Sequence, residues 1–258
     1  MALVKISVQQ QAGTIILDRP EKRNALTREL LVELDQALQD LLHERQVRAV
    51  VLTGAGSAFC AGMDLDEMRA TAESPDPQAQ WGEDAMQYRD LLVTMLEFPK
   101  PIIAAVNGPA VAGGAGLVLA CDLVVGSPEA KFGLPEPRRG IVAGIVGPLL
   151  AFRVGAGQAA RLLLNPTPIE AAEAHRIGLY HELALLQQIW VRAVALAGEC
   201  AHGAPSALQL TKRMLNETIG ERLMTQLAAG AALSAAARTT EAAREGLDAF
   251  LERRDPQW

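Results

Sequence analysis

The segment Leu52-Thr-Gly-Ala-Gly-Ser-Ala-Phe-Cys-Ala-Gly-Met-Asp-Leu65 leads from an apolar, β-branched run through a glycine-rich turn into residues of helical character. A second segment repeats this pattern, Val106-Asn-Gly-Pro-Ala-Val-Ala-Gly-Gly-Ala-Gly-Leu-Val-Leu-Ala-Cys-Asp122. The two patterns predict helix starts near Asp64 and Gly113. N–H groups at a helix start have no intrahelical partner and carry partial positive charge, so either turn could bind an anion. Together, the two turns could enclose one developing oxyanion.

The segments around these turns predict an α/β fold with parallel strands. In Arg28–Glu44 the leucines recur at helical spacing and Thr27 is a suitable N-cap, which predicts a βαβ unit with the flanking strands. Beyond about residue 145 the pattern is helical, and Thr167-Pro-Ile-Glu170 is predicted to open a helix with a capping box. The segment Glu73–Pro77 is predicted to be a surface loop. The predicted buried strands are Gly13–Asp18, Arg48–Thr53, Pro101–Val106 and Asp122–Gly126.

The composition argues against several classes of function. A chain of 258 residues, 50 % of them apolar, can bury a full core, and its net charge of −6 gives no general attraction to nucleic acid or anionic lipid. No apolar run reaches the roughly 18 residues of a membrane span. The N-terminal residues lack the pattern of a signal or transit peptide, so we expect a cytoplasmic protein. The three cysteines and four histidines have no disulfide, triad or metal-ligand spacing, and no metal site is expected.

Glycine-rich turns between a strand and a helix can also have a purely structural role, because they often serve only close packing. An oxidoreductase with a nucleotide cofactor would use such a turn to bind a pyrophosphate. Neither segment has the required G-x-G-x-x-G spacing, and no acidic residue follows a later strand in the expected place. These considerations leave an oxyanion-binding site or a packing device.

Four motifs occur together in this chain: Arg19-Pro-Glu-Lys-Arg-Asn-Ala-Leu26, Phe59-Cys-Ala-Gly-Met-Asp-Leu65, Asn107-Gly-Pro-Ala-Val-Ala-Gly-Gly-Ala-Gly116 and Phe132-Gly-Leu-Pro-Glu136. In their order and spacing, over essentially the whole chain, they resemble the enoyl-CoA hydratase/isomerase (crotonase) superfamily. The resemblance implies a crotonase-like (ClpP/crotonase) α/β spiral of ββα units. It implies a core at residues 1–195 and a C-terminal helical trimerisation region at residues 196–258. A homotrimer or a dimer of trimers is expected.

The resemblance also implies an enzyme that acts on an acyl-CoA thioester, with coenzyme A as part of the substrate and no separate cofactor. The backbone N–H groups of Met63 and Gly113 would form an oxyanion hole that stabilises an enolate. Glu136 would be the acid/base, its pKa raised by partial burial. Coenzyme A would lie against the following residues, the last two from a neighbouring subunit: Arg23, Ala25, Ala61, Asp64, Leu65, Phe250 and Arg253.

The chain departs from the family's two-glutamate hydratases at Gly116, where those enzymes carry the second glutamate. One carboxylate is enough to shift a double bond or to activate water alone. Hydration, lyase chemistry and isomerisation therefore stay open. A non-catalytic acyl-CoA-binding subunit is the alternative, and the retained Glu136 argues against it.

The segment Asp66–Arg89 falls where the family builds its acyl pocket, although a helical stripe of this kind is more often ordinary core. Three carboxylates could replace the lost glutamate if they faced inward, although each fits a solvated helix face equally well: Glu67, Glu83 and Asp84. The predicted pocket side chains are Met68, Trp81, Met86 and Tyr88.

Overall fold

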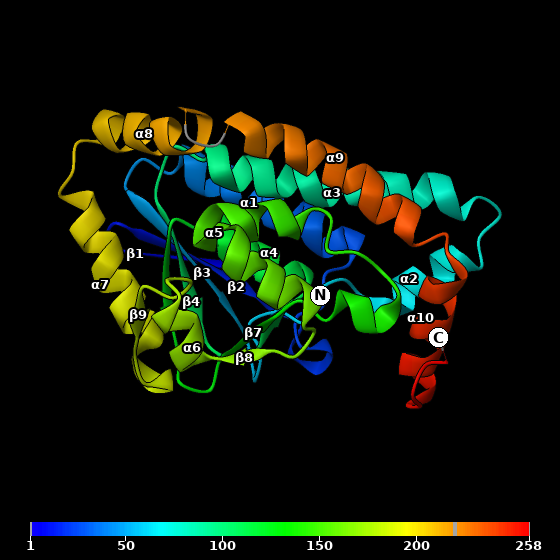
Figure 1. The fold of residues 1–258 in the computed structure, drawn as a ribbon. Coiled ribbons are helices and arrows are strands. Elements are labelled where there is room, and N and C mark those ends of the chain that lie inside the picture. The colour runs from blue at the N-terminus through cyan, green and yellow to red at the C-terminus, as the bar shows by residue number, and fades with distance from the viewer. Residues whose placement is uncertain (1, 219–220, 258) are drawn as a thin grey trace.

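The computed structural model describes residues 2–218 and 221–257, and its centre is a six-stranded sheet (Figure 1). The strand order is β1-β2-β3-β4-β6-β9; β1 runs antiparallel to β2, and the other neighbours are parallel. A second sheet has the order β5-β7-β8. The strands are β1 (Val4–Gln9), β2 (Ala12–Leu17), β3 (Ala49–Gly54), β4 (Ile102–Val106), β5 (Ala110–Val111), β6 (Leu123–Gly126), β7 (Lys131–Gly133), β8 (Ile169–Glu170) and β9 (Glu182–Leu183).

The predicted parallel strands are confirmed as β2, β3, β4 and β6. They are buried because helices cover both faces of the sheet, which gives their near-continuous apolar sequences. Strand β1 was not predicted. Only Val4 of this strand is buried, so its sequence lacks the long apolar run that marked the others.

The helices begin and end largely where the sequence placed them. The side chain of Thr27 accepts a hydrogen bond from the N–H of Leu30 and caps α1, as predicted. The side chain of Asp64 caps α2 in the same way, and α4 begins at Gly113. The helices are α1 (Arg28–His43), α2 (Leu65–Ala72), α3 (Pro77–Glu97), α4 (Gly113–Ala120), α5 (Val146–Leu164), α6 (Ala171–Arg176), α7 (Ile189–Ala201), α8 (Pro205–Arg213), α9 (Glu221–Ala237) and α10 (Glu241–Glu252).

The predicted capping box at Thr167–Glu170 is wrong. Ile169 and Glu170 form β8, which pairs with Phe132 and Lys131 of β7, and α6 begins only at Ala171. Pairing with the neighbouring strand overrode a local helix-start pattern. The predicted surface loop is shorter than expected, because Pro77 is already the first residue of α3.

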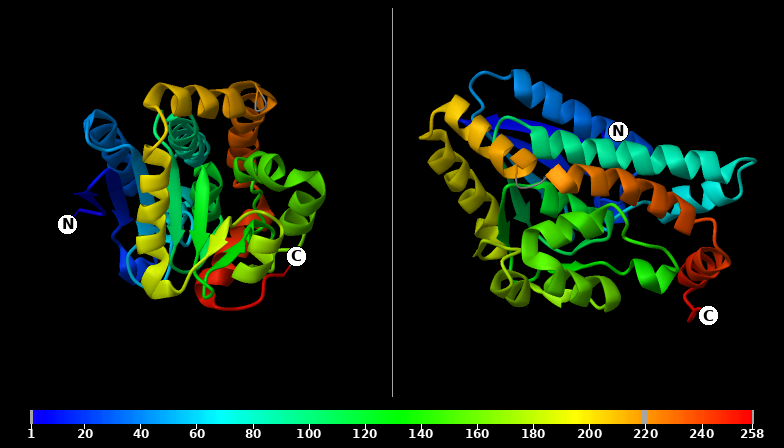
Figure 2. Two further views of the ribbon diagram at one scale, coloured as in Figure 1. Left: turned by 90° about the vertical axis from the view of Figure 1, so that its left-hand side faces the viewer. Right: turned by 45° about the horizontal axis from the view of Figure 1, so that its top comes forward.

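Helices α8 and α9 run one after the other across the top of the view in Figure 1, and α10 lies at the end away from α7. Helix α9 lies along α3 and contacts α5, and α10 returns to the turn that contains Glu136 (Figures 1 and 2). Helix α7 packs on the large sheet and runs through residue 195, so the predicted boundary between core and helical region falls inside a core helix. The covering helices therefore begin after Ala201. In the described part of the chain, no helix is long and apolar enough to cross a membrane.

Candidate active site

The turn before α2 presents the N–H of Met63. The N–H of Leu26 donates to the oxygen of Gly62 at 2.8 Å, and the N–H of Asp64 donates to the oxygen of Leu26 at 2.9 Å. These two bonds flank Met63, whose own N–H donates to no acceptor among the described residues. Gly62 has φ +89°, a left-handed conformation that favours glycine.

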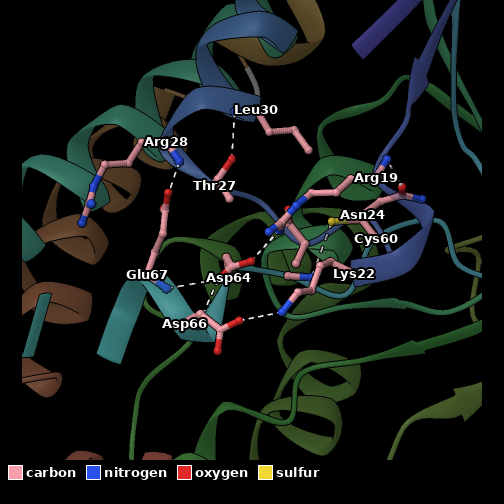
Figure 3. Close-up of polar contacts among 12 residues, drawn as sticks. Arg19, Lys22, Asn24, Thr27, Arg28, Leu30, Cys60, Asp64, Asp66 and Glu67 are labelled. Carbon is pink, nitrogen blue, oxygen red and sulfur yellow. Dashed lines mark hydrogen bonds and ion pairs between the residues drawn. The ribbon is translucent and has the colours of Figure 1, made fainter. Parts of the chain in front are cut away.

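A polar cluster between Arg19 and Glu67 holds this turn in place (Figure 3). Arg19 Nη1 lies 2.5 Å from an Asp64 carboxylate oxygen, while the other oxygen of Asp64 caps α2. Asn24 is fully buried, and its amide nitrogen donates to the carbonyl oxygens of Ala55, Ala58 and Phe59. The Asp64 side chain is thus occupied in holding the fold, and its backbone N–H and carbonyl oxygen are hydrogen-bonded to Leu26 and Met68.

The turn before α4 presents the N–H of Gly113 beside Met63. A Cβ added to Gly113 would lie 3.6 Å from the Met63 nitrogen, so the two predicted donors are neighbours. Gly113 opens α4, and its N–H makes no hydrogen bond to any described residue. A Cβ on Gly114 would lie 2.3 Å from the Cys60 oxygen, which requires glycine there. The N–H groups of Met63 and Gly113 therefore lie close together, each without an acceptor among the described residues.

Glu136 lines the same cavity as Met63 and Gly113 and is buried, with 6 % of its surface exposed. Burial raises its pKa to about 7, and the positive charges of Arg139 and Arg238 oppose that rise. Its Oε2 atom is buried and has no hydrogen-bond partner among the described residues. A carboxyl group with a pKa near neutrality suits general acid/base chemistry.

Helix α10 fixes the short 3₁₀ turn η2 (Glu136–Arg139) that carries this glutamate. A Cβ on Gly140 would lie 2.2 Å from the Ala242 oxygen, and one on Gly246 would lie 2.4 Å from the Arg139 carbonyl carbon. Backbone therefore packs directly on backbone at both points. The position of Glu136 depends on a helix that lies more than 100 residues later in the chain.

Tyr88 of α3 fills the space beside Gly116. A Cβ on Gly116 would lie 2.0 Å from the Tyr88 hydroxyl oxygen. That hydroxyl donates a hydrogen bond of 2.5 Å to the carbonyl oxygen of Gly113. Burial raises the pKa of Tyr88 well above its usual value, with Cys60 and Glu136 adding to the rise, so the phenol stays protonated.

These groups line a cavity of about 60 Å³, which shares several lining residues with a second cavity of about 310 Å³. The small cavity includes Met63, Gly113, Glu136 and Tyr88. The second is lined by Trp81 and by residues of α10. The walls common to both are Leu65, Met68, Arg139, Ile141 and Arg238.

A sequence model of enoyl-CoA hydratase/isomerase matches residues 7–258. The chain belongs to this family. It is 42 % identical to a putative enoyl-CoA hydratase of Thermus thermophilus over 97 % of this chain and 100 % of that protein. It is 34 % identical to the 2,3-dehydroadipyl-CoA hydratase of Escherichia coli over 100 % and 99 %. An enoyl-CoA hydratase structure from Mycobacterium avium superposes with a TM-score of 0.89 at 32 % identity, covering 100 % of this chain and 99 % of that chain.

The predicted crotonase-like α/β fold is therefore confirmed, and the protein is an enoyl-CoA hydratase/isomerase family enzyme that acts on acyl-CoA. The structure brings five of the predicted site residues to the small cavity: Ala61, Met63, Leu65, Gly113 and Glu136. The other predicted residues do not line it. Ala25 and Asp64 are buried in the wall behind it, and Arg23, Phe250 and Arg253 are exposed.

For the exposed residues Arg23, Phe250 and Arg253, binding of coenzyme A stays a prediction. Arg23 ends the turn before Asn24 in a left-handed conformation with φ +52°. Phe250 lies under the guanidinium group of Arg139 in the same chain, 4.5 Å from its ring centre. Arg253 ends α10.

Of the predicted pocket residues, Met68, Trp81 and Tyr88 line the two cavities, whereas Met86 is exposed. Of the three carboxylates weighed as replacements, only Asp84 lines the cavity. It is bound by Arg28 through two hydrogen bonds of 2.6 and 2.8 Å. This ion pair makes Asp84 a poor proton carrier.

Sequence reasoning missed the two arginines of the cavity, Arg139 and Arg238. Arg139 stands beside the Glu136 motif, and Arg238 follows the apolar run Leu233-Ser-Ala-Ala-Ala237. Across residues 2–218 and 221–257, no three His, Cys, Asp or Glu side chains gather as a metal ion would require.

Proposed function

We propose that this enzyme adds water reversibly to a 2-enoyl-CoA, with Glu136 as its single acid/base. The supporting observation is the buried Glu136 carboxyl, whose Oε2 has no hydrogen-bond partner among the described residues, in the same cavity as Met63 and Gly113. The thioester carbonyl oxygen would accept hydrogen bonds from the N–H groups of Met63 and Gly113. Hydratase activity is also the named activity of both relatives described above.

The steps balance with one carboxylate. Ionised Glu136 takes a proton from a water molecule whose oxygen bonds to C3, and the π electrons move onto the thioester oxygen as an enolate. The two N–H groups stabilise that negative charge; losing one such donor costs roughly 10²–10³ in rate. Glu136 then returns its proton to C2, and the carbonyl re-forms.

Tyr88 supports hydration without a second glutamate. Its hydroxyl hydrogen is committed to the Gly113 oxygen, so its oxygen can accept a hydrogen bond from the attacking water. Because Gly116 supplies no second carboxylate, isomerisation of the double bond is a second candidate reaction. In this reaction Glu136 removes a proton from C2 and returns it to C4, which shifts the double bond without adding water.

Coenzyme A would lie along Arg23, Ala25, Ala61, Asp64 and Leu65, mostly on backbone groups. A neighbouring subunit of a homotrimer or dimer of trimers would supply Phe250 and Arg253. The reaction needs no cofactor beyond the coenzyme A of the substrate itself.

The test compares wild type, Glu136→Gln and the exposed control Glu129→Gln. The substrates are crotonyl-CoA, a 3-enoyl-CoA and the CoA thioester of a 2-unsaturated dicarboxylic acid, and mass spectrometry identifies the products. Glu136→Gln should lower kcat by roughly 10²–10⁴ while coenzyme A still binds. A product heavier by one water supports hydration, and an isobaric product selects isomerisation. Binding without turnover in wild type would leave the non-catalytic subunit as the better description.

A further inference from the structure

Two arginines enter the active-site cavity from different parts of the chain. Arg139 belongs to the Glu136 turn η2, and Arg238 follows the last turn of α9. Both line the small and the larger cavity. Neither forms an ion pair or donates a hydrogen bond within residues 2–218 and 221–257, and both Nε atoms are buried without a partner.

Unpartnered polar atoms concentrate at these cavities. The described residues contain six buried side-chain nitrogen or oxygen atoms without a hydrogen-bond partner. Four of them belong to residues lining the two cavities: Trp81, Glu136, Arg139 and Arg238. Native proteins leave few such atoms, so a cluster of four indicates groups that a ligand completes.

The charges around the arginines do not neutralise them. Asp84 and Glu136 are the carboxyl groups that act on Arg238, but Asp84 is held by Arg28. Glu136 has a pKa of about 7 and is partly neutral at physiological pH. The face of Arg139 is covered by the Phe250 ring, which supplies no full negative charge. Both arginines are only partly exposed, and a cation withdrawn from water without a counter-charge is costly, so this arrangement favours an anionic ligand group.

We propose that Arg139 and Arg238 bind a carboxylate at the far end of the acyl chain. The substrate class would be a CoA thioester of an unsaturated dicarboxylic acid. The inference rests on the proposed function for the position of the thioester between Met63, Gly113 and Glu136. From there the acyl chain runs past Leu65 and Met68, which line both cavities, to the two guanidinium groups.

Saturated thioesters test this subsite without requiring turnover. Isothermal titration calorimetry would measure binding of adipyl-CoA, hexanoyl-CoA and free coenzyme A to the full-length enzyme and its variants. Adipyl-CoA should bind wild type roughly 10- to 100-fold more tightly than hexanoyl-CoA, the range for a charge-assisted hydrogen bond. Arg238→Gln should remove most of that advantage, and Arg238→Lys should restore part of it.

Arg138→Gln is the matched control. Arg138 precedes Arg139 in the same turn, but it is exposed and donates to Thr167 outside the cavity. This variant should keep the full preference for adipyl-CoA. Melting temperatures would identify any variant that fails to fold, in which case Arg238→Lys and Arg139→Gln carry the comparison.

Two results would overturn the inference. Equal affinities of wild type for adipyl-CoA and hexanoyl-CoA would show that Arg139 and Arg238 do not bind the carboxylate. Equal weakening of all three ligands in Arg238→Gln would assign the arginines to the phosphates of coenzyme A. A preference for adipyl-CoA in an enzyme that hydrates no enoyl-CoA would keep the subsite and reject only the proposed reaction.

Discussion

The oxyanion wall of the cavity, made by residues 61–65 and 112–116, differs in construction from the Glu136 wall, made by residues 136–146 and Arg238. Behind the oxyanion wall the side chains of Asp64 and Asn24 are hydrogen-bonded, and the N–H groups of Met63 and Gly113 have no acceptor among the described residues. The Glu136 wall keeps unpartnered atoms on Glu136 and on both arginines. One wall is a closed framework that holds backbone donors, and the other presents side chains to a ligand.

The difference suggests that the two walls have different roles in binding and reaction. In the proposed mechanism the oxyanion wall would bind the carbonyl oxygen that all thioesters share. The Glu136 wall would carry the proton and face the variable acyl group. Changes in the first wall should therefore damage the fold or all reactions alike, and changes in the second should alter pH dependence and substrate choice.

Among changes to the oxyanion wall, the largest expected effect on activity is that of Gly62→Ala. Gly62 has a positive φ, and its added Cβ would lie 2.7 Å from the Ala112 Cβ and 3.2 Å from the Gly113 nitrogen. The two turns should be forced apart, with kcat/KM falling roughly 10²–10³-fold on every substrate. Gly82→Ala on α3 is the control, because its Cβ meets nothing within 4 Å. A folded Gly62→Ala enzyme with wild-type kcat/KM would show that this turn is not a rigid donor.

Asn24→Ala should act on stability. It removes one acceptor and three donor contacts of a buried side chain in a left-handed conformation. Unpaired carbonyl groups and the unfavourable backbone should together cost about 3 kcal/mol of the free energy of unfolding. Urea denaturation measures this, with the exposed Asn165→Ala as a control. Equal unfolding midpoints for the two variants would contradict the framework role.

The oxyanion wall could be predicted from the sequence because its glycine-rich turns and helix caps leave local patterns. Thr27 and Asp64 cap helices that begin at the next residue. The contacts that hold the two turns together, such as Gly62 against Ala112 and Gly114 against Cys60, are long-range and leave no such pattern. The Glu136 wall is assembled by α3, α9 and α10, from residues up to about a hundred positions away. Packing of Gly140 on Ala242 and the inward direction of Arg238 have no local pattern, so motif resemblance supplied Glu136 but not its neighbours.

The pH dependence of kcat/KM should reflect the ionisation of Glu136 and the groups of the Glu136 wall around it. As a base Glu136 must be ionised, so kcat/KM should rise with pH and level off above about 7. Arg238 lowers the pKa of Glu136, so Arg238→Gln should move the midpoint to higher pH. Arg138→Gln should leave it in place. A profile that is flat between pH 5 and 9 would exclude Glu136 as the essential base.

Stability should change with pH in the opposite direction. The pKa of Glu136 rises on folding from 4.5 to about 7, so the folded state retains the proton more strongly than the unfolded chain. Its contribution to stability is fully present below about pH 4.5 and is lost as the pH rises to about 7. Glu136→Gln should therefore gain stability over wild type at pH 8, as measured by urea denaturation. No gain at pH 8 relative to pH 4 would contradict the burial argument.

The smallest expected effect, that of Tyr88→Phe, tests the point where the two walls meet. The variant leaves the Gly113 oxygen without its 2.5 Å hydrogen bond and removes the proposed acceptor for water. The loss of one such bond should lower kcat roughly tenfold with little change in KM. Tyr180→Phe is a matched control, because the Tyr180 hydroxyl is buried without a partner and its removal should leave kcat unchanged.

The same contact determines what Gly116→Glu can do. The Cβ of the new residue would lie 2.0 Å from the Tyr88 hydroxyl oxygen, so the tyrosine and a second carboxylate exclude each other. Gly116→Glu alone should therefore lose stability and activity, whereas Gly116→Glu combined with Tyr88→Ala has room for the carboxylate. If the double variant hydrates crotonyl-CoA faster than Tyr88→Ala, the tyrosine occupies the place of a second acid/base group. If the two are equal, Tyr88 acts only by holding the Gly113 turn.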